Sequence, residues 1–215
     1  MNDPHRLGAA LAFAEHARGE SPSPPWQPLA SRLGEAALRA RIEHVRNSLP
    51  SPTGELAEPR VAASTEHLGL AARLVSAHIC ARALGLSVDL TASEIWWQQE
   101  PGTLLQLSVA RTAAPRNPLR DGAIEQLTAT VQQLYGVSPH VLWGNVGSAA
   151  NSTVTLLRAS RPDLVAAARG AADELLQDPR VDGGTLRAGP GFRRRSCCLI
   201  YRAGVGMCGD CVLRS

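Results

Sequence analysis

The stretch STEHLGLAARLVSAHICARALG, residues 64–85, carries a clear helical pattern. It opens with Ser64 and Glu66, residue types that favour a helix start, and it ends at Gly85, a residue type that often terminates helices. Its apolar residues recur at the spacing of one helix face: Leu68, Ala71, Leu74, Val75, Ile79 and Ala83. The sequence therefore predicts a helix here whose apolar face packs against other elements.

Outward from this helix, helical spacing recurs in most of the chain, interrupted by one region of alternating residues. Helices are predicted over residues 4–18, 29–48, 118–136, 138–160 and 161–179. Short strands are predicted around residues 88–90, 94–97 and 103–111, with a Pro-Gly turn between the last two, and again at CLIY, residues 198–201. The fold class expected is α+β, mainly helical with a small antiparallel sheet.

The amino-acid composition excludes several classes of chemistry and partner. Of 215 residues, 22 are arginine and none is lysine, which excludes a Walker phosphate loop, a Schiff base and a Ser-Lys dyad. The arginines are spread along the chain and the net charge is only +3, so we expect no nucleic-acid partner. No stretch is apolar enough for an integral membrane segment, and the cysteines are few and odd in number, so we expect a cytoplasmic protein.

Four of the five cysteines lie in SCCLIYRAGVGMCGDC, residues 196–211. Cys197 and Cys198 are adjacent, and Cys208 and Cys211 form a CxxC pair, so four soft ligands gather in a short segment. Adjacent side chains tend to point apart, which disfavours one tetrahedral zinc ion and favours the separated positions of a [2Fe-2S] cluster. A structural zinc site and a disulfide remain alternatives on spacing alone.

The cysteine stretch resembles a known family signature. The residues RRRSCCLIYRAGVGMCGDC, 193–211, are similar to the C-terminal signature of ferric-siderophore reductases of the FhuF type, and LWGNVGSAANS, 142–152, resembles that family's Trp-Gly-Asn stretch. The chain departs from the pattern in having nine residues between Cys198 and Cys208, where ten are more usual, and Val212 where proline often follows. No departure removes a cysteine.

The resemblance implies a cytoplasmic ferric-siderophore reductase, in which a [2Fe-2S] cluster held by the four cysteines passes an electron to chelated Fe(III). It implies residues 1–189 as a helical α+β reductase-like domain, with residues 190–215 as a cluster-binding segment packed on it. No nucleotide-binding fingerprint is present, so the electron donor is expected to be a separate ferredoxin, flavin or NAD(P)H-dependent reductase. The alternative is a non-enzymatic siderophore- or partner-binding protein with a structural zinc at the cysteines.

Six further residues are candidates for a supporting or substrate-contacting role. The basic run from Arg193 to Arg195 could contact substrate or solvent, and positive charge near a cluster favours its reduced form. Trp97 offers a ring to a flat siderophore, and Asn145 a side-chain amide that could donate to a carbonyl or a sulfur. The candidates are Arg194, Arg195, Arg202, Trp143, Asn145 and Trp97.

Overall fold

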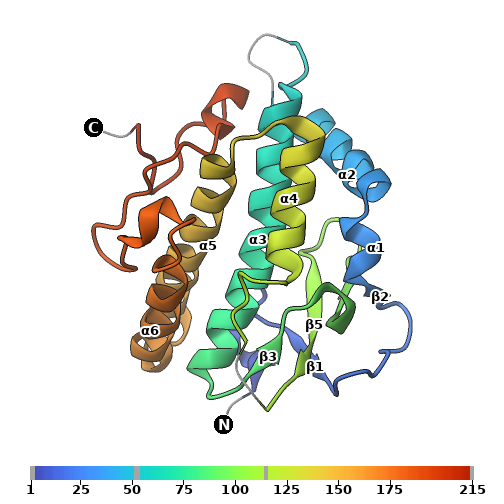
Figure 1. Cartoon of the computed structure of the whole chain (residues 1–215), viewed down its shortest axis with the longest axis vertical. Helices are drawn as coiled ribbons and strands as arrows, with labels where there is room; N and C mark the ends of the chain where they lie inside the picture. Colours follow the sequence, from blue (N-terminus) through green and yellow to red (C-terminus); the bar gives the residue numbers. More distant parts are fainter. Residues whose placement is uncertain (1–2, 51–53, 114–115, 214–215) are drawn as a thin grey trace.

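A long helix, α3 (Pro59–Ala83), runs through the middle of the molecule (Figure 1). The computed structural model describes residues 3–50, 54–113 and 116–213. The predicted helix at 64–85 is confirmed, but it begins earlier, at Pro59, because proline fits a first helical turn, where its missing N–H is not needed. Helices α2, α4, α5 and α6 all pack against α3.

The other helices follow the predicted order. Gly34 divides the predicted helix at 29–48 into two, because its backbone is extended there. Apart from α3, the α-helices of the described residues are α1 (Leu29–Leu33), α2 (Glu35–Ser48), α4 (Ala123–Tyr135), α5 (Pro139–Ser160) and α6 (Val165–Leu176). Short 3-10 helices occur at Pro4–Leu7 (η1), Ala92–Glu94 (η2), Pro162–Leu164 (η3), Asp182–Gly184 (η4) and Ile200–Ala203 (η5).

The sheet is small and mixed. Its strands are β1 (Ala14–His16), β2 (Gln27–Pro28), β3 (Val88–Asp89), β4 (Ile95–Gln98) and β5 (Gln106–Arg111). Their order is β1-β5-β4-β2, and β3 also pairs with β5. The predicted β4–β5 hairpin is antiparallel, with Trp97 opposite Leu107. The expectation of an antiparallel sheet is wrong for β1, which pairs in parallel with β5.

Two local predictions are wrong for backbone reasons. Residues 4–18 do not form one helix, because Gly8 turns the chain with a φ of 87° after η1, and the chain then extends into β1. The apolar spacing does not reflect one helix face, because Leu7 is buried from the end of η1 and Leu11 is buried from the turn that follows Gly8. At CLIY the predicted strand is absent, because Leu199 adopts a left-handed φ of 69° and η5 follows.

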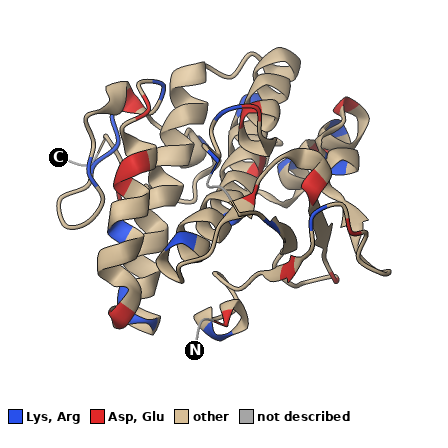
Figure 2. Ribbon diagram, turned by 60° about the horizontal axis from the view of Figure 1, so that its bottom comes forward, with Lys and Arg blue, Asp and Glu red and all other residues tan. Residues whose placement is uncertain are grey.

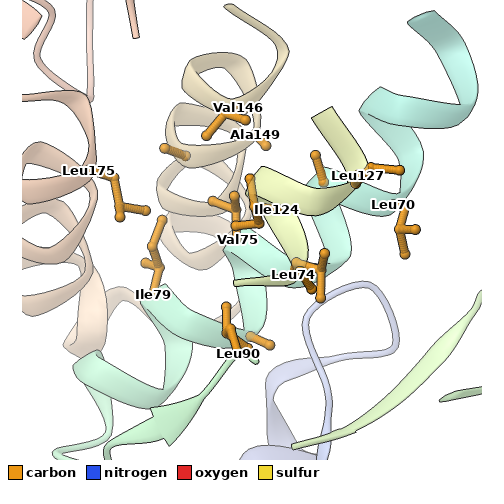
Figure 3. Close-up of a cluster of buried hydrophobic side chains, with 14 of the residues drawn as sticks. Leu70, Leu74, Val75, Ile79, Leu90, Ile124, Leu127, Val146, Ala149 and Leu175 are labelled. Carbon is orange, nitrogen blue, oxygen red and sulfur yellow. The ribbon is translucent and has the colours of Figure 1, made fainter. Parts of the chain in front are cut away.

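The core lies where α3 meets its neighbours (Figure 3). Leu74 and Val75 of α3 are fully buried, and so are Ile124 of α4 and Val146 of α5. Burying each such side chain contributes about 1.5–3 kcal/mol, so this contact region supplies a large part of the driving force for folding. Within the part of the chain that the structure describes, no helix is long and apolar enough to cross a membrane.

Candidate metal centre

The four clustered cysteines lie in a C-terminal segment, residues 190–213, that we call the cysteine segment. It runs beside α5 and reaches the N-terminal half of α3, at the end of the molecule away from the sheet (Figure 1). The Ser64 hydroxyl, on α3, donates a 2.9 Å hydrogen bond to the carbonyl of Cys198. Ser64 is fully buried, so this contact ties the Cys197–Cys198 pair to the helical core.

The cysteines are free thiols gathered on a tight loop. The sulfurs of Cys198 and Cys208 lie 3.6 Å apart. Two thiolates on one tetrahedral metal ion, with bonds of about 2.3 Å, are separated by roughly 3.8 Å, so this pair has the spacing of two ligands to one metal. In the described residues, no group of three or more His, Cys, Asp or Glu side chains is arranged to hold one ion.

The loop backbone directs N–H groups at two of the sulfurs. The N–H of Leu199 donates to the sulfur of Cys197, and that of Leu213 donates to the sulfur of Cys211, each at 3.4 Å. The left-handed φ of Leu199 accompanies the turn that follows the cysteine pair. Hydrogen bonds to sulfur are one of the factors that set the potential of an iron–sulfur centre.

Exposure divides the cysteines into two kinds. Cys198 and Cys211 are buried, whereas Cys197 and Cys208 are partly exposed. Burial raises the pKa of the Cys197 thiol, and burial together with the neighbouring Cys198 raises that of Cys208. Metal loading therefore has to displace protons from these thiols.

A buried polar network joins the cysteine segment to three helices. Arg194, which is 1% exposed, donates from Nη2 to Oδ1 of Asn145 on α5 at 2.9 Å. The Asn145 amide donates in turn to the carbonyl of Ser64 at 3.1 Å and lies 3.4 Å from Nδ1 of His67. Nε2 of His67 is 3.0 Å from the hydroxyl of Thr128, on α4.

The network also fixes the state of the histidine. The Thr128 hydroxyl donates to the carbonyl of Ile124, so it accepts from Nε2 of His67, and Nδ1 of His67 is left to accept from Asn145. Burial and the charge of Arg194 lower the pKa of His67 to about 3. The histidine is therefore neutral at physiological pH.

The Trp-Gly-Asn stretch of α5 has three separate tasks. A Cβ added at Gly144 would lie 1.7 Å from Oγ of Ser196, so only glycine allows the cysteine segment to approach the helix this closely. Asn145 supplies the polar anchor. The ring of Trp143 lies 4.2 Å beneath the guanidinium of Arg180 and so packs on a neighbouring loop.

The remaining candidates are placed apart from one another. Arg193 and Arg195 are exposed, and basic residues gather on this segment (Figure 2). The backbone N–H of Arg195 donates to Asp182 at 2.9 Å, and Arg202 forms an exposed ion pair of 3.1 Å with Glu58. Trp97 lies in β4, 4.7 Å beneath the guanidinium of Arg32, in the sheet that Figure 1 shows away from the cysteine segment.

Sequence reasoning missed three members of the site. By its pattern Ser64 is only a helix-start residue, and the sequence singles out neither His67 nor Thr128. Their signal in the sequence is weak, because single polar residues on an apolar helix face gain meaning only when the partner helices are known. Asn145 was found only through the resemblance.

A C-terminal loop with four free cysteines, two of which have the sulfur spacing of ligands to one metal, is typical of a metal-binding protein. Residues 194–213 match the family model described as the FhuF 2Fe-2S C-terminal domain. The match confirms the predicted resemblance and identifies the cofactor as a [2Fe-2S] cluster. No curated protein matches the chain.

Proposed function

We propose that this protein is a ferric-siderophore reductase of the cytoplasm. Its [2Fe-2S] cluster would be held by Cys197, Cys198, Cys208 and Cys211 and would supply one-electron transfer. Residues 190–215 would form the cluster-binding segment, with residues 1–189 as the domain on which it packs. The observation that carries the proposal is the loop of free cysteines inside the FhuF 2Fe-2S match.

The proposed reaction needs only one electron. The donor protein loses an electron, chelated Fe(III) gains it and becomes Fe(II), and no bond of the siderophore breaks. Oxygen-donor chelators hold the harder ferric ion much more tightly than ferrous iron. The reduced ion is therefore released without further chemistry from the protein.

Exposed apolar residues of the cysteine segment fit a docking role. Tyr201, Val205, Met207 and Leu213 are 40%, 49%, 49% and 51% exposed, and we call them the loop patch. All four belong to the cysteine segment, and exposed apolar side chains are typical of interaction sites. Arg193 nearby adds positive charge, which favours an anionic chelate or the acidic face of a donor.

The donor and the siderophore would use the loop patch in turn. Cys198 and Cys211 are buried, so the exposed side of the centre is that of Cys197 and Cys208. A cavity of about 390 Å³ beside Asp89 and Arg116 adjoins β3, which follows the C-terminal end of α3. It is not placed to hold an acceptor close to the cysteines.

The first experiment is metal analysis with single-turnover kinetics. Anaerobically purified protein should contain about two irons and two sulfides per chain and lose visible absorption on dithionite reduction. The reduced protein should then be reoxidised by ferric siderophores, with Fe(II) captured by a chromogenic chelator. Cys208→Ser should abolish both the visible absorption and the release of Fe(II). Cys80 is buried on α3, away from the cysteine segment in sequence, so Cys80→Ser should leave the visible spectrum intact.

Three results would contradict the proposal. One zinc ion without sulfide would favour the binding protein with a structural zinc. A reducible cluster that no ferric chelate reoxidises would favour a simple electron carrier. Loss of the spectrum in Cys80→Ser alone would overturn the proposed ligand set.

A further inference from the structure

Among the residues that the structure describes, two arginines are buried, Arg32 and Arg194, and they differ in whether a carboxylate lies beside them. Arg32 is 6% exposed and forms a 3.0 Å ion pair with Glu66. Arg194 is 1% exposed, and within residues 3–50, 54–113 and 116–213 it forms no ion pair. The hydrogen-bond acceptors of Arg194 are all neutral: Oδ1 of Asn145, the carbonyl of Val141 and Oγ of Ser196.

The guanidinium of Arg194 also has unused donors. Its Nε and Nη1 are buried without a hydrogen-bond partner among the described residues. Arginine does not lose its proton in proteins, and an unpaired buried charge is strongly destabilising. Among the described residues, the guanidinium of Arg194 therefore has no carboxylate within ion-pair distance, whereas that of Arg32 has Glu66 at 3.0 Å. The acidic residue Asp210 contacts Arg194 only through its backbone carbonyl.

The iron–sulfur centre would supply a negative charge close to Arg194. Arg194 donates from Nη2 to Oγ of Ser196, the residue before Cys197, at 3.3 Å, and its backbone N–H donates to the carbonyl of Asp210, the residue before Cys211, at 3.2 Å. Arg194 is therefore held beside both cysteine-bearing ends of the loop. A [2Fe-2S] cluster with four thiolate ligands carries net negative charge, and this charge grows when the cluster accepts an electron. A nearby positive charge stabilises the reduced form more than the oxidised one and so raises the reduction potential.

We propose that Arg194 is the built-in counter-charge of the cluster and a positioning residue that sets its reduction potential. Asn145 holds the guanidinium in place, and Ser64 and His67 hold Asn145. The neutral His67 adds no second cation to the network. The inference deepens the proposed function, but it depends only on the [2Fe-2S] cofactor and not on the siderophore.

The test is a spectroelectrochemical titration of the cluster in the holoprotein. Arg194→Gln keeps a donor but removes the charge, and we expect the equilibrium constant for reduction to fall at least tenfold, about 59 mV for a one-electron couple. Arg194→Lys should stay within about threefold of the parent protein, because it keeps the charge. The matched controls are Arg193→Gln and Arg195→Gln, which remove the same charge from exposed neighbours.

Salt separates buried from exposed charge. At about 1 M salt the screening length is about 3 Å, so any shift in the two control variants should disappear while that of Arg194→Gln persists. A shift for Arg194→Gln no larger than in the controls, or one abolished by salt, would overturn the inference.

If Arg194→Gln does not retain the cluster, the variant Asn145→Ala tests whether Arg194 sets the reduction potential. Asn145→Ala keeps the charge but removes the acceptor that orients it, so we expect a smaller fall in potential with the electron paramagnetic resonance spectrum of the reduced cluster altered. An unchanged potential and spectrum in Asn145→Ala would reject the positioning role. If the potentials shift as expected but no ferric siderophore is reduced, the inference stands and the proposed function fails.

Discussion

The helical body around α3 and the cysteine segment are stabilised by different kinds of contact. In the body, apolar side chains from α1 to α6 fill a continuous core, part of which Figure 3 shows. In the cysteine segment, few residues are buried, and the chain is attached through Ser64, Asn145 and the close approach at Gly144. Because the contacts differ, we expect a mutation in the core to lower the stability of the body without loss of the cluster. A mutation at the attachment points should release the cluster while the body stays folded.

The largest effect on stability should come from the body. Leu74→Ala removes a fully buried side chain at the centre of the core and should lower the free energy of unfolding by about 2–5 kcal/mol. Chemical denaturation followed by circular dichroism measures this. The visible spectrum of the folded variant should match that of the parent, and a bleached but fully stable Leu74→Ala protein would break the comparison.

Gly144→Ala should affect retention of the cluster more than the stability of the helical body. The added methyl group would collide with Ser196, and overpacking of this kind costs about 1–3 kcal/mol, which is most easily relieved by displacing the cysteine segment. We expect faster loss of the cluster to a chelator, with a smaller change in the unfolding of the body. Gly170→Ala is the control, since a Cβ there meets nothing within 4 Å.

Acid should weaken the body through its buried histidines. Burial lowers the pKa of His78 to about 4 and that of His67 to about 3, from the ordinary value of 6.5. Below pH 6.5 the unfolded chain gains protons that the folded protein does not, so stability is fully present above about pH 6.5 and falls toward pH 4. His78→Gln should flatten this slope in denaturation series, whereas a flattening by His44→Gln, which is exposed, would contradict the assignment.

A substitution in the loop patch should have the smallest effect on stability but should slow electron transfer from a protein donor. Met207→Asp is exposed and should change the free energy of unfolding by no more than about 0.5 kcal/mol. It should nevertheless slow reduction of the cluster by an acidic ferredoxin several-fold, with dithionite reduction unaffected. Leu156→Asp, exposed on α5, is the control, and equal slowing by both variants would remove the loop patch from the proposal.

Much of the body could be predicted because helical periodicity is local. The apolar faces of α3, α4 and α5 follow from residue spacing, and the β4–β5 hairpin follows from its turn. The parallel pairing of β1 could not be predicted, because it depends on a partner strand far along the chain. The path at Leu199 is likewise set by the turn around the cysteines and not by the propensity of CLIY for a strand.

Part of the candidate site could also be predicted from the sequence, and part could not. The cysteine cluster and the class of cofactor followed from residue type, spacing and resemblance. The contact between Arg194 and Asn145 could not be derived, since nothing in the sequence indicates that two residues 49 positions apart share one hydrogen bond. Trp97, an attractive candidate by residue type, lies under Arg32 in the sheet.

The chain order of the anchors bears on how the protein is assembled. Ser64, Thr128 and Asn145 all precede the cysteines in the sequence, so a ribosome completes the helices that receive the cysteine segment before it makes any of the four thiols. The receiving surface can fold during synthesis. Cofactor insertion then becomes a late maturation step at the exterior of a folded scaffold, with no need to reopen the core.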